Sequence, residues 1–401
     1  MAKVAGLNGY FDISVYDYPV PKPMDDSVLI KVEAAAICGS EHGLVEWKGE
    51  HAPGVMGHEF CGHIVKMGKN AGKSLHVFGG ELNVGDRIVV YPHVTCGHCG
   101  GCLKFGDGVC GACEDEFFYG GGWDDREVPG TLSEECAKWP HFKGGFGEYV
   151  HVMGNTYCWK VPDDMPSEIA VLLDPCAVAM RAVEEAMTTM GALDEGYSTS
   201  ATALIVGAGP IGIMAAMILK HMGVEKVIIT DFLDKKLEMA AEISRADLLL
   251  NVSSMTVEER IQKISEITGG GADIVINSAN HPASCIEALQ MVRFLGHYIE
   301  IGNANSWANP DFSISINPAA VIFEKNAHVT SVCANSPGTF DRAFRLLKKH
   351  KELPFHKLVT HKFSTLEELL PTIRKMKDPD YLKGVWIPEE QEENDEKDCH
   401  N

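Results

Sequence analysis

The strongest chemical signal in the sequence is a group of four closely spaced cysteines on a glycine-rich stretch. The run CGHCGGCLKFGDGVC has a C-x2-C-x2-C-x7-C spacing, which lets a short, turn-rich segment wrap a tetrahedral ion. Four thiolates that leave no coordination position open describe a structural zinc site. An iron–sulfur cluster is the main chemical alternative, but the long last spacing and the absence of a following proline favour zinc. The predicted ligands are Cys96, Cys99, Cys102 and Cys110, with Cys113 as a further thiol close by.

A second group of metal-ligating residues precedes the four cysteines. Cys38 stands in AAAICGSEHG, and His58 and Glu59 stand in VMGHEFCGHIV. A thiolate, an imidazole and a carboxylate near the ends of neighbouring β segments would form a zinc site with one position open, as a catalytic zinc requires. Other imidazoles compete within the same stretch, and spacing alone does not choose among them: His42, His51 and His63.

The third motif is the glycine pattern G-x-G-x-x-G in LIVGAGPIG. It follows an apolar strand and opens the helical segment IMAAMILKHMG, and Asp231 ends the next strand about 20 residues later. The glycines allow a tight turn and close approach of a pyrophosphate, while the helix N-terminus supplies free N–H groups. An aspartate at this place bonds the adenosine ribose and repels the extra phosphate of NADP, so the pattern predicts NAD. The predicted contacts are Gly207, Gly209, Pro210, Ile211, Gly212 and Asp231.

The elements that must position these motifs fall into two kinds. From residue 10 to about 161, short β-like runs such as SVLIKVEAAAI and DRIVVYP are separated by Gly, Pro, Asn and Asp turns. From about residue 166, apolar strands alternate with helical segments, which indicates a parallel sheet covered by helices. VTSVCAN, from residue 329, could supply a last strand, and the helices and strand that follow could rejoin the first part.

Composition limits the partners and the compartment. The 401 residues are 45% hydrophobic and 23% charged, as in a globular protein, and the formal charge of -21 disfavours nucleic acid and anionic membranes as partners. The uncharged stretch 198–219 is broken by glycine and proline, so it predicts a strand, turn and helix and not a membrane span. The N-terminus lacks a signal-peptide pattern, and the 13 cysteines are dilute, so we expect a cytoplasmic protein.

The order of these motifs resembles the zinc-dependent medium-chain dehydrogenase/reductase family, the alcohol dehydrogenase-like enzymes. ICGS, GHEF, VGDRIVV, GGFGEYV, VGAGPIG and KLVTHKFS carry the resemblance over nearly the whole chain. It implies an α/β plus β fold, with a GroES-like β domain that carries both zinc sites and a Rossmann doubly wound domain, in a homodimer or homotetramer. The implied limits are 1–166 and 337–389 for the GroES-like domain, about 93–113 for the structural-zinc lobe, and 167–336 for the Rossmann domain. Apart from the resemblance, the acidic run at 390–401 has almost nothing to bury and predicts a solvated tail.

The resemblance also implies roles for single residues. Cys38 and His58 match the first two catalytic zinc ligands, and either Glu59 or Asp174 is the third, while Cys176 keeps a cysteine ligand open. The remaining matches are Ser40, which starts the proton relay, Lys236, which assists cofactor binding, and Ile301 and Gly302, which lie near the nicotinamide.

Two features depart from the family pattern. The usual relay histidine is replaced by Gly43, and the nearest imidazole is His42. The segment 114–143 is long and aromatic, so it could cover the substrate cleft, form a subunit interface, or simply pack on itself.

The expected reaction is hydride transfer between a secondary alcohol and NAD, with one catalytic and one structural zinc per chain. Charged zinc ligands and the Asp-Pro element favour a polyol or a hydroxylated sugar or cyclitol derivative, by analogy. A threonine-type amino-alcohol dehydrogenase is the alternative substrate class. A non-catalytic dinucleotide-binding protein is the alternative from another class, and a zinc-ribbon nucleic-acid binder is disfavoured by the charge.

Overall fold

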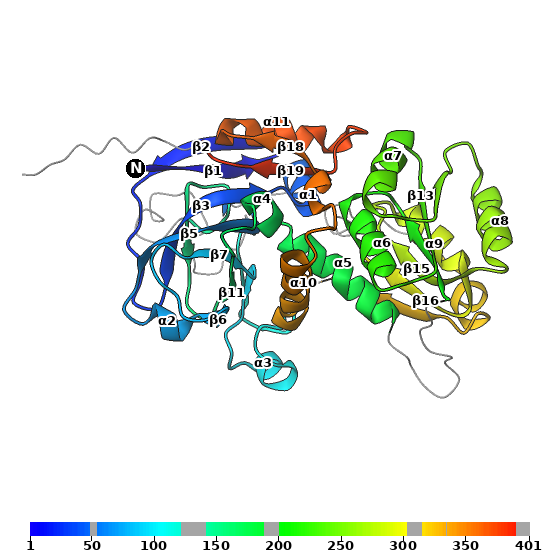
Figure 1. Ribbon diagram of the computed structural model, residues 1–401, viewed down its shortest axis with the longest axis horizontal. Helices are drawn as coiled ribbons and strands as arrows, with labels where there is room; N and C mark the ends of the chain where they lie inside the picture. The colour runs from blue at the N-terminus through cyan, green and yellow to red at the C-terminus, as the bar shows by residue number, and fades with distance from the viewer. Residues whose placement is uncertain (49–53, 122–141, 188–199, 303–314, 334, 390–401) are drawn as a thin grey trace, which may run out of the picture.

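The computed structural model describes the 401-residue chain except for 49–53, 122–141, 188–199, 303–314, 334 and 390–401 (Figure 1). A β-rich part that contains both the first and the last strands lies beside an α/β part (Figure 1). The limits of the two domains in residue numbers stay a prediction.

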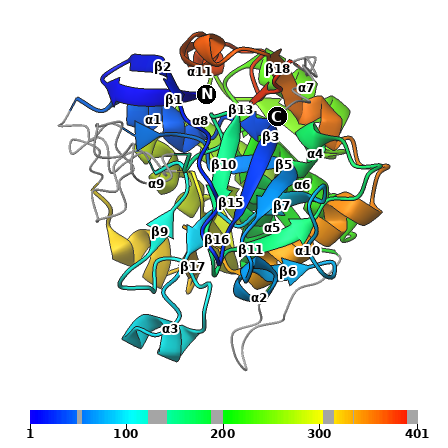
Figure 2. The ribbon, with the colours of Figure 1, turned by 90° about the vertical axis from the view of Figure 1, so that its left-hand side faces the viewer.

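The largest sheet combines strands from the two ends of the chain. Its order is β18-β19-β3-β5-β7-β11-β6, and β10 also pairs with β3. The strands are β3 (Val28–Ala36), β5 (Glu59–Met67), β6 (His76–Phe78), β7 (Arg87–Val90), β10 (Tyr149–Val152), β11 (Tyr157–Lys160), β18 (Val359–Phe363) and β19 (Lys383–Trp386). Because β19 pairs with the end of β3, the last of the described strands lies next to the segment that leads to Cys38 (Figure 2).

Two smaller sheets and several short helices complete this part. A three-stranded sheet has the order β2-β1-β4, and β8 pairs with β9. The strands are β1 (Ala2–Gly9), β2 (Asp12–Tyr18), β4 (Gly54–Val55), β8 (His93–Val94) and β9 (Phe117–Phe118). The helices are α1 (Gly39–Glu46), α2 (Ala71–Ser74), α3 (Gly100–Phe105), α4 (Ser167–Ala170) and α11 (Leu369–Arg374), with 3₁₀ turns at Phe355–Leu358, Leu366–Glu368 and Lys375–Lys377.

The α/β part is built on a six-stranded sheet in which every pair is parallel. The order β14-β13-β12-β15-β16-β17 reverses direction after β12, which confirms the expected Rossmann doubly wound topology. The strands are β12 (Thr202–Val206), β13 (Lys226–Asp231), β14 (Leu248–Asn251), β15 (Ala272–Asn277), β16 (Val292–Glu300) and β17 (His328–Ser331). The helices are α5 (Leu173–Ala186), α6 (Pro210–His221), α7 (Asp234–Ile243), α8 (Val257–Thr268), α9 (Pro282–Gln290) and α10 (Pro337–Lys349), with a π-helical turn at Ala319–Phe323.

One hydrophobic core connects the two parts. Helix α5 packs against both α6 and α10, and α10 also contacts β11 of the large sheet. The same buried cluster contains Trp159 of β11 and Ile205 of β12. The two parts are therefore held together by a shared core.

A half-buried ion pair fixes the chain where it enters this junction. Glu33 of β3 accepts hydrogen bonds from Arg87 Nε at 2.8 Å and from Ser167 Oγ at 2.7 Å, and Ser167 is the first residue of α4. Burial opposes ionisation of Glu33, but hydrogen bonds from His63, Ser167 and Arg87 outweigh it and lower the pKa of the carboxyl to about 2.

We predict an acid-sensitive contribution from Glu33 to stability. Since its folded pKa lies below the ordinary 4.5, the contribution is complete above pH 4.5 and is lost as the pH falls toward 2. Glu33→Gln should lower the free energy of unfolding by about 2 kcal/mol at pH 7. Urea unfolding of both proteins at several pH values checks this. A difference between them that stays constant from pH 6 to pH 2.5 would contradict the assignment.

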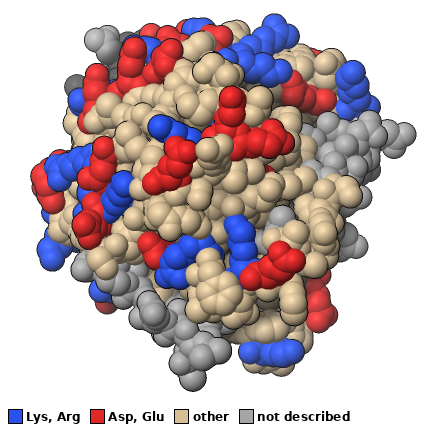
Figure 3. Space-filling view, turned by 90° about the vertical axis from the view of Figure 1, so that its right-hand side faces the viewer, with Lys and Arg blue, Asp and Glu red and all other residues tan. Residues whose placement is uncertain are grey.

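A membrane or a nucleic acid would each require particular features of the helices and of the surface. None of the helices within the described ranges has the length and apolar character that a membrane crossing requires. On the face viewed from the α/β end, acidic and basic side chains of the described residues are interspersed (Figure 3).

Candidate functional site

Strand register brings Cys38 next to His58 and Glu59. Strands β3 and β5 are antiparallel, and Ala36 at the end of β3 lies opposite Glu59 at the start of β5. Cys38, two residues beyond Ala36, is the N-cap residue of α1. One ligating atom from each of Cys38, His58 and Glu59 lies within 4.8 Å of the others. Two adjacent strand ends thus present a thiol, an imidazole and a carboxylate to one point.

A glycine turn aims His58 and Glu59 at this point. Gly57 has φ +97°, and a Cβ on it would come within 2.8 Å of the backbone nitrogen of Phe146. Only glycine combines this conformation with so close a backbone approach. The turn directs the first residues of β5 toward Cys38.

Glu41 supports the site from within α1, and the sequence reasoning missed it. Its carboxylate accepts a hydrogen bond from the backbone N–H of Cys38 at 2.8 Å and lies 3.8 Å from His58 Nδ1. Glu41 is fully buried, and its Oε1 atom has no hydrogen-bond partner among the described residues. Burial raises the pKa of Glu41 to about 7. The capping-box spacing, three residues after the N-cap, is the signal that could have identified it.

Lys383 is the second residue that the sequence reasoning missed. It comes from β19, is 3% exposed, and donates from Nζ to Glu59 Oε1 at 2.7 Å. Burial disfavours the charge, but Glu59 and Cys38 outweigh burial and raise the pKa of Lys383. The ammonium therefore balances the buried carboxylate.

The electrostatics of the three donors suit a divalent cation. Burial raises the pKa of Glu59 to about 7, against the attraction of Lys383. Burial alone would lower the pKa of His58, but the adjacent Cys38 and Glu41 raise it to about 10. Two buried carboxylates and a thiol gathered around one imidazole favour bound positive charge. This donor set fits a zinc ion with an open position, as does the nearby Glu41 Oε1 atom, which has no hydrogen-bond partner among the described residues.

The other predicted residues around Cys38 lie at different distances from the donors. Asp174, in the first turn of α5, has Oδ2 4.0 Å from His58 Nε2, but it does not join the three atoms that lie within 4.8 Å of one another. Cys176 is fully buried in the hydrophobic core. Ser40 lies in the first turn of α1 and is half-buried. His42 pairs with Glu46 at 3.2 Å instead.

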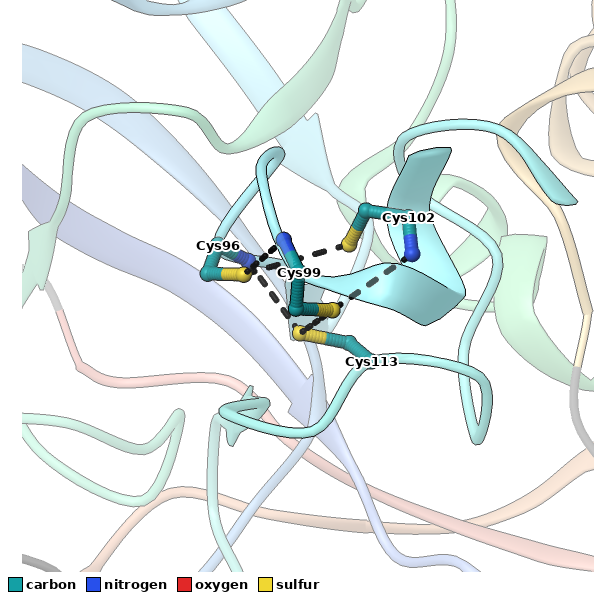
Figure 4. Close-up of side chains that lie close together, drawn as sticks. All are labelled: Cys96, Cys99, Cys102 and Cys113. Atoms are coloured by element: carbon teal, nitrogen blue, oxygen red, sulfur yellow. Dashed lines mark hydrogen bonds between the residues drawn. The ribbon is translucent and has the colours of Figure 1, made fainter. Parts of the chain in front are cut away.

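The cysteine lobe brings four sulfurs together around α3 (Figure 4). The distance from Cys96 Sγ to Cys102 Sγ is 4.0 Å, and the distance from Cys99 Sγ to Cys113 Sγ is also 4.0 Å. Hydrogen bonds from the backbone N–H groups of Cys102 and Glu114 lower the pKa of Cys99 to about 6. Four converging sulfurs with backbone donors around them fit a closed zinc site.

The fourth sulfur is that of Cys113, so the prediction of Cys110 is wrong. The backbone of Ala112 lies directly against Gly101 of α3, where a Cβ would come 1.6 Å from the Ala112 carbonyl oxygen. This close approach places Cys113 beside Cys99, while Cys110 is buried elsewhere, beside His93 and Glu116. Spacing along the chain could not distinguish two thiols only three residues apart.

The glycine turn has the geometry that a dinucleotide site needs. Gly207 has φ +100°, Gly209 is the N-cap of α6, and Pro210 is its first residue. A Cβ on Gly212 would come 2.2 Å from the carbonyl oxygen of Gly207. Ile211 follows in the first turn. The turn lies at the carboxyl end of β12, where the strand order reverses and α/β proteins bind ligands.

The remaining cofactor residues surround this turn. Asp231 ends β13 and accepts hydrogen bonds from the N–H groups of Ala208 at 2.7 Å and Leu233 at 2.9 Å. Ile301 and Gly302 follow β16, and the Ile301 N–H donates to the Asn277 carbonyl at 3.0 Å. Lys236, in the first turn of α7, donates from Nζ to the carbonyl oxygen of Tyr381 and is also attracted by the carboxylate of Asp231.

Part of the aromatic segment reaches the site. The ring of Phe118 lies 5.2 Å from that of His58, centroid to centroid, and Tyr119 is fully buried against Phe60. The predicted cover or interface formed by residues 122–141, which include Trp123 and Trp139, lies outside the described residues.

Comparison with known proteins agrees with this arrangement. A family model for the alcohol dehydrogenase GroES-like domain matches residues 24–163, and one for zinc-binding dehydrogenases matches residues 210–349. These matches confirm the expected GroES-like fold class of the β-rich part.

Relatives and solved structures extend the similarity over the chain. It is 28% identical to a sorbitol dehydrogenase from Bombyx mori over 368 residues, 90% of this chain and 91% of the relative. It is 30% identical to an L-threonine 3-dehydrogenase from Xanthomonas campestris over 289 residues, 71% and 72% of the two chains. A structure of an alcohol dehydrogenase from Escherichia coli in complex with NADH aligns with a TM-score of 0.75 at 26% identity, over 96% of this chain and 99% of the other.

Proposed function

The chain belongs to the zinc-dependent medium-chain dehydrogenase/reductase family, and from this premise we propose that it oxidises a secondary alcohol of a polyol or a hydroxylated sugar or cyclitol derivative to a ketone with NAD. The observation that carries the proposal is the convergence of Cys38, His58 and Glu59 within 4.8 Å. A non-catalytic dinucleotide-binding protein has no chemical need for these three donors together.

Different residues bind the metal, position its ligands and transfer the proton. Zinc bound by Cys38, His58 and Glu59 supplies a Lewis acid for the substrate hydroxyl, and NAD supplies the hydride acceptor. Glu41 holds the backbone of Cys38 in place through a hydrogen bond, and its negative charge lies 3.8 Å from the ring of His58. Ser40, two residues after Cys38, accepts the proton of the substrate hydroxyl as it releases its own. Because His42 pairs with Glu46, the proton passes from Ser40 to solvent without an imidazole.

The substrate class is tested by the formation of NADH at 340 nm with polyols, inositols, simple secondary alcohols and L-threonine. We expect turnover with polyols or cyclitols, because charged ligands and the relative that acts on sorbitol favour them. Turnover with L-threonine alone would show that the substrate is an amino alcohol and not a polyol, while the proposed hydride transfer to NAD would still hold. Silence across the panel, with NAD and zinc both bound, would overturn the polyol assignment.

Asp231 is predicted to select NAD over NADP. Its carboxylate ends β13 beside the glycine turn and would repel a phosphate on the adenosine ribose. Asp231→Ala should raise the KM for NAD about 10- to 100-fold and reduce the preference for NAD over NADP. Steady-state kinetics with both cofactors measure this, with Asp234→Ala as a nearby control. An unchanged cofactor ratio in Asp231→Ala would contradict the role.

We propose, in addition, a homo-oligomer in the cytoplasm. Among the described residues, strand β17 is the last strand of its sheet, and three large apolar side chains are exposed near it: Phe294, Phe323 and Val329. Such an edge favours pairing with a second copy. The free thiols of the described residues suit a reducing compartment. Light scattering that gives the mass of a single 43.7 kDa chain would contradict the oligomer.

A further inference from the structure

A third set of metal-ligating side chains lies outside both sites described above. His93, Cys110 and Glu116 each offer one ligating atom, and the three atoms lie within 4.8 Å of one another. Because Cys113 completes the four-sulfur group, Cys110 lies outside that group and belongs to this set. We propose that His93, Cys110 and Glu116 bind a third divalent metal ion, of the zinc class.

Backbone contacts bring the three residues together. His93 of β8 lies opposite Phe118 of β9, so Glu116, just before β9, reaches the His93 ring. The N–H of Gly111 donates to Glu116 Oε2 at 2.7 Å, and this bond also fixes the adjacent Cys110. Three short segments are thus tied to one another around the proposed ion.

The donor chemistry favours zinc over a hard cation. One nitrogen, one sulfur and one oxygen form a mixed donor set of the kind that zinc accepts, whereas calcium and magnesium take oxygen donors. Cys110 is 9% exposed, and the side chains of His93 and Glu116 are 20% and 15% exposed. The set is therefore sheltered but reachable, and three protein ligands leave a fourth position for water or a small ligand.

The proposed ion would lie beside the dehydrogenase site. The ring of Phe118 is 4.6 Å from that of His93 and 5.2 Å from that of His58, centroid to centroid. A single phenyl ring therefore contacts one histidine of each set. A dication at His93 would add positive charge near His58, but the proposal does not depend on the dehydrogenase activity.

Metal content tests the proposal directly. The full-length protein is loaded with Zn²⁺, freed of unbound metal by gel filtration, and analysed by mass spectrometry of the metal. We expect about three zinc ions per chain in the wild type and about two in Cys110→Ser and in His93→Gln, with unchanged circular dichroism. Cys285→Ser removes a thiol that belongs to none of the three sets and should keep three. His93→Gln serves as the test if Cys110→Ser does not fold.

Cobalt spectra distinguish the rival explanation. If Cys110 is a ligand of the four-sulfur site, Cys110→Ser will change the intense sulfur-to-cobalt absorption of that site and Cys113→Ser will not. We expect the opposite result: Cys113→Ser should weaken the sulfur-to-cobalt absorption of the four-sulfur site, and Cys110→Ser should leave the absorption of that site unchanged. Two zinc ions in the wild type that persist in Cys110→Ser would overturn the proposal and leave a hydrogen-bonded cluster. Loss of the four-sulfur spectrum in Cys110→Ser would overturn it as well.

Discussion

Replacement of Cys38 by serine is expected to lower kcat/KM about a thousandfold or more and to remove one zinc ion per chain. A serine hydroxyl stays protonated near neutral pH, so it cannot replace the thiolate among the three donors. Loss of the Lewis acid removes several kcal/mol of transition-state stabilisation, and each 1.36 kcal/mol is a factor of ten in rate. NADH formation at 340 nm and metal analysis of the same samples measure both effects.

The matched control for Cys38→Ser is Cys285→Ser, which removes a half-buried thiol of the α/β part. It should keep the activity, and both variants should bind NAD as the wild type does, since the glycine turn is unchanged. Cys38→Ser with wild-type activity would show that the three donors do not form the catalytic site. If Cys38→Ser loses NAD binding as well as zinc while Cys285→Ser binds NAD normally, the Cys38→Ser protein is misfolded.

Replacement of Lys383 by methionine is expected to have the largest effect on stability. The Lys383 ammonium and the Glu59 carboxylate are 3% and 2% exposed, and they are 2.7 Å apart. Methionine retains the packing but leaves a buried carboxylate without its partner, which costs about 3–5 kcal/mol. Thermal unfolding of the zinc-free protein should show the loss as a lower midpoint.

The double variant Glu59→Gln/Lys383→Met separates charge from packing. Because it removes both charges, it should be more stable than Lys383→Met alone by about 1–3 kcal/mol. If the double variant loses the sum of the two single losses, the two side chains do not interact and the ion pair has no energetic role.

The dinucleotide turn could be predicted from sequence because its determinants are local. Gly207, Gly212 and Asp231 lie within one strand, turn, helix and strand, and each is fixed by backbone requirements that only certain residues meet. The pairing of Cys38 with His58 could also be predicted, because both residues match the family's pattern of catalytic zinc ligands. The choice between Glu59 and Asp174 did not follow, because it depends on how α5 lies relative to β5.

The residues that were missed or misassigned depend on contacts between distant or crowded segments. Lys383 lies 324 residues from Glu59, and no local pattern connects them. Cys113 replaces Cys110 at the four sulfurs because a glycine in α3 admits the backbone of Ala112. Such a close approach is a property of the packed lobe, and spacing along the chain does not encode it.

The return of the chain to its first sheet also sets the order of events during synthesis. Strand β3 and the donors Cys38, His58 and Glu59 leave the ribosome early, but β19 follows only after the whole α/β part. Until then Glu59 has no Lys383 beside it, and the edge of β3 that β19 covers is exposed to other chains. A nascent chain is therefore most vulnerable to aggregation while the α/β part is being made. A messenger RNA truncated before the codon for Lys383 would yield a protein with a complete dinucleotide-binding sheet and an incomplete metal site.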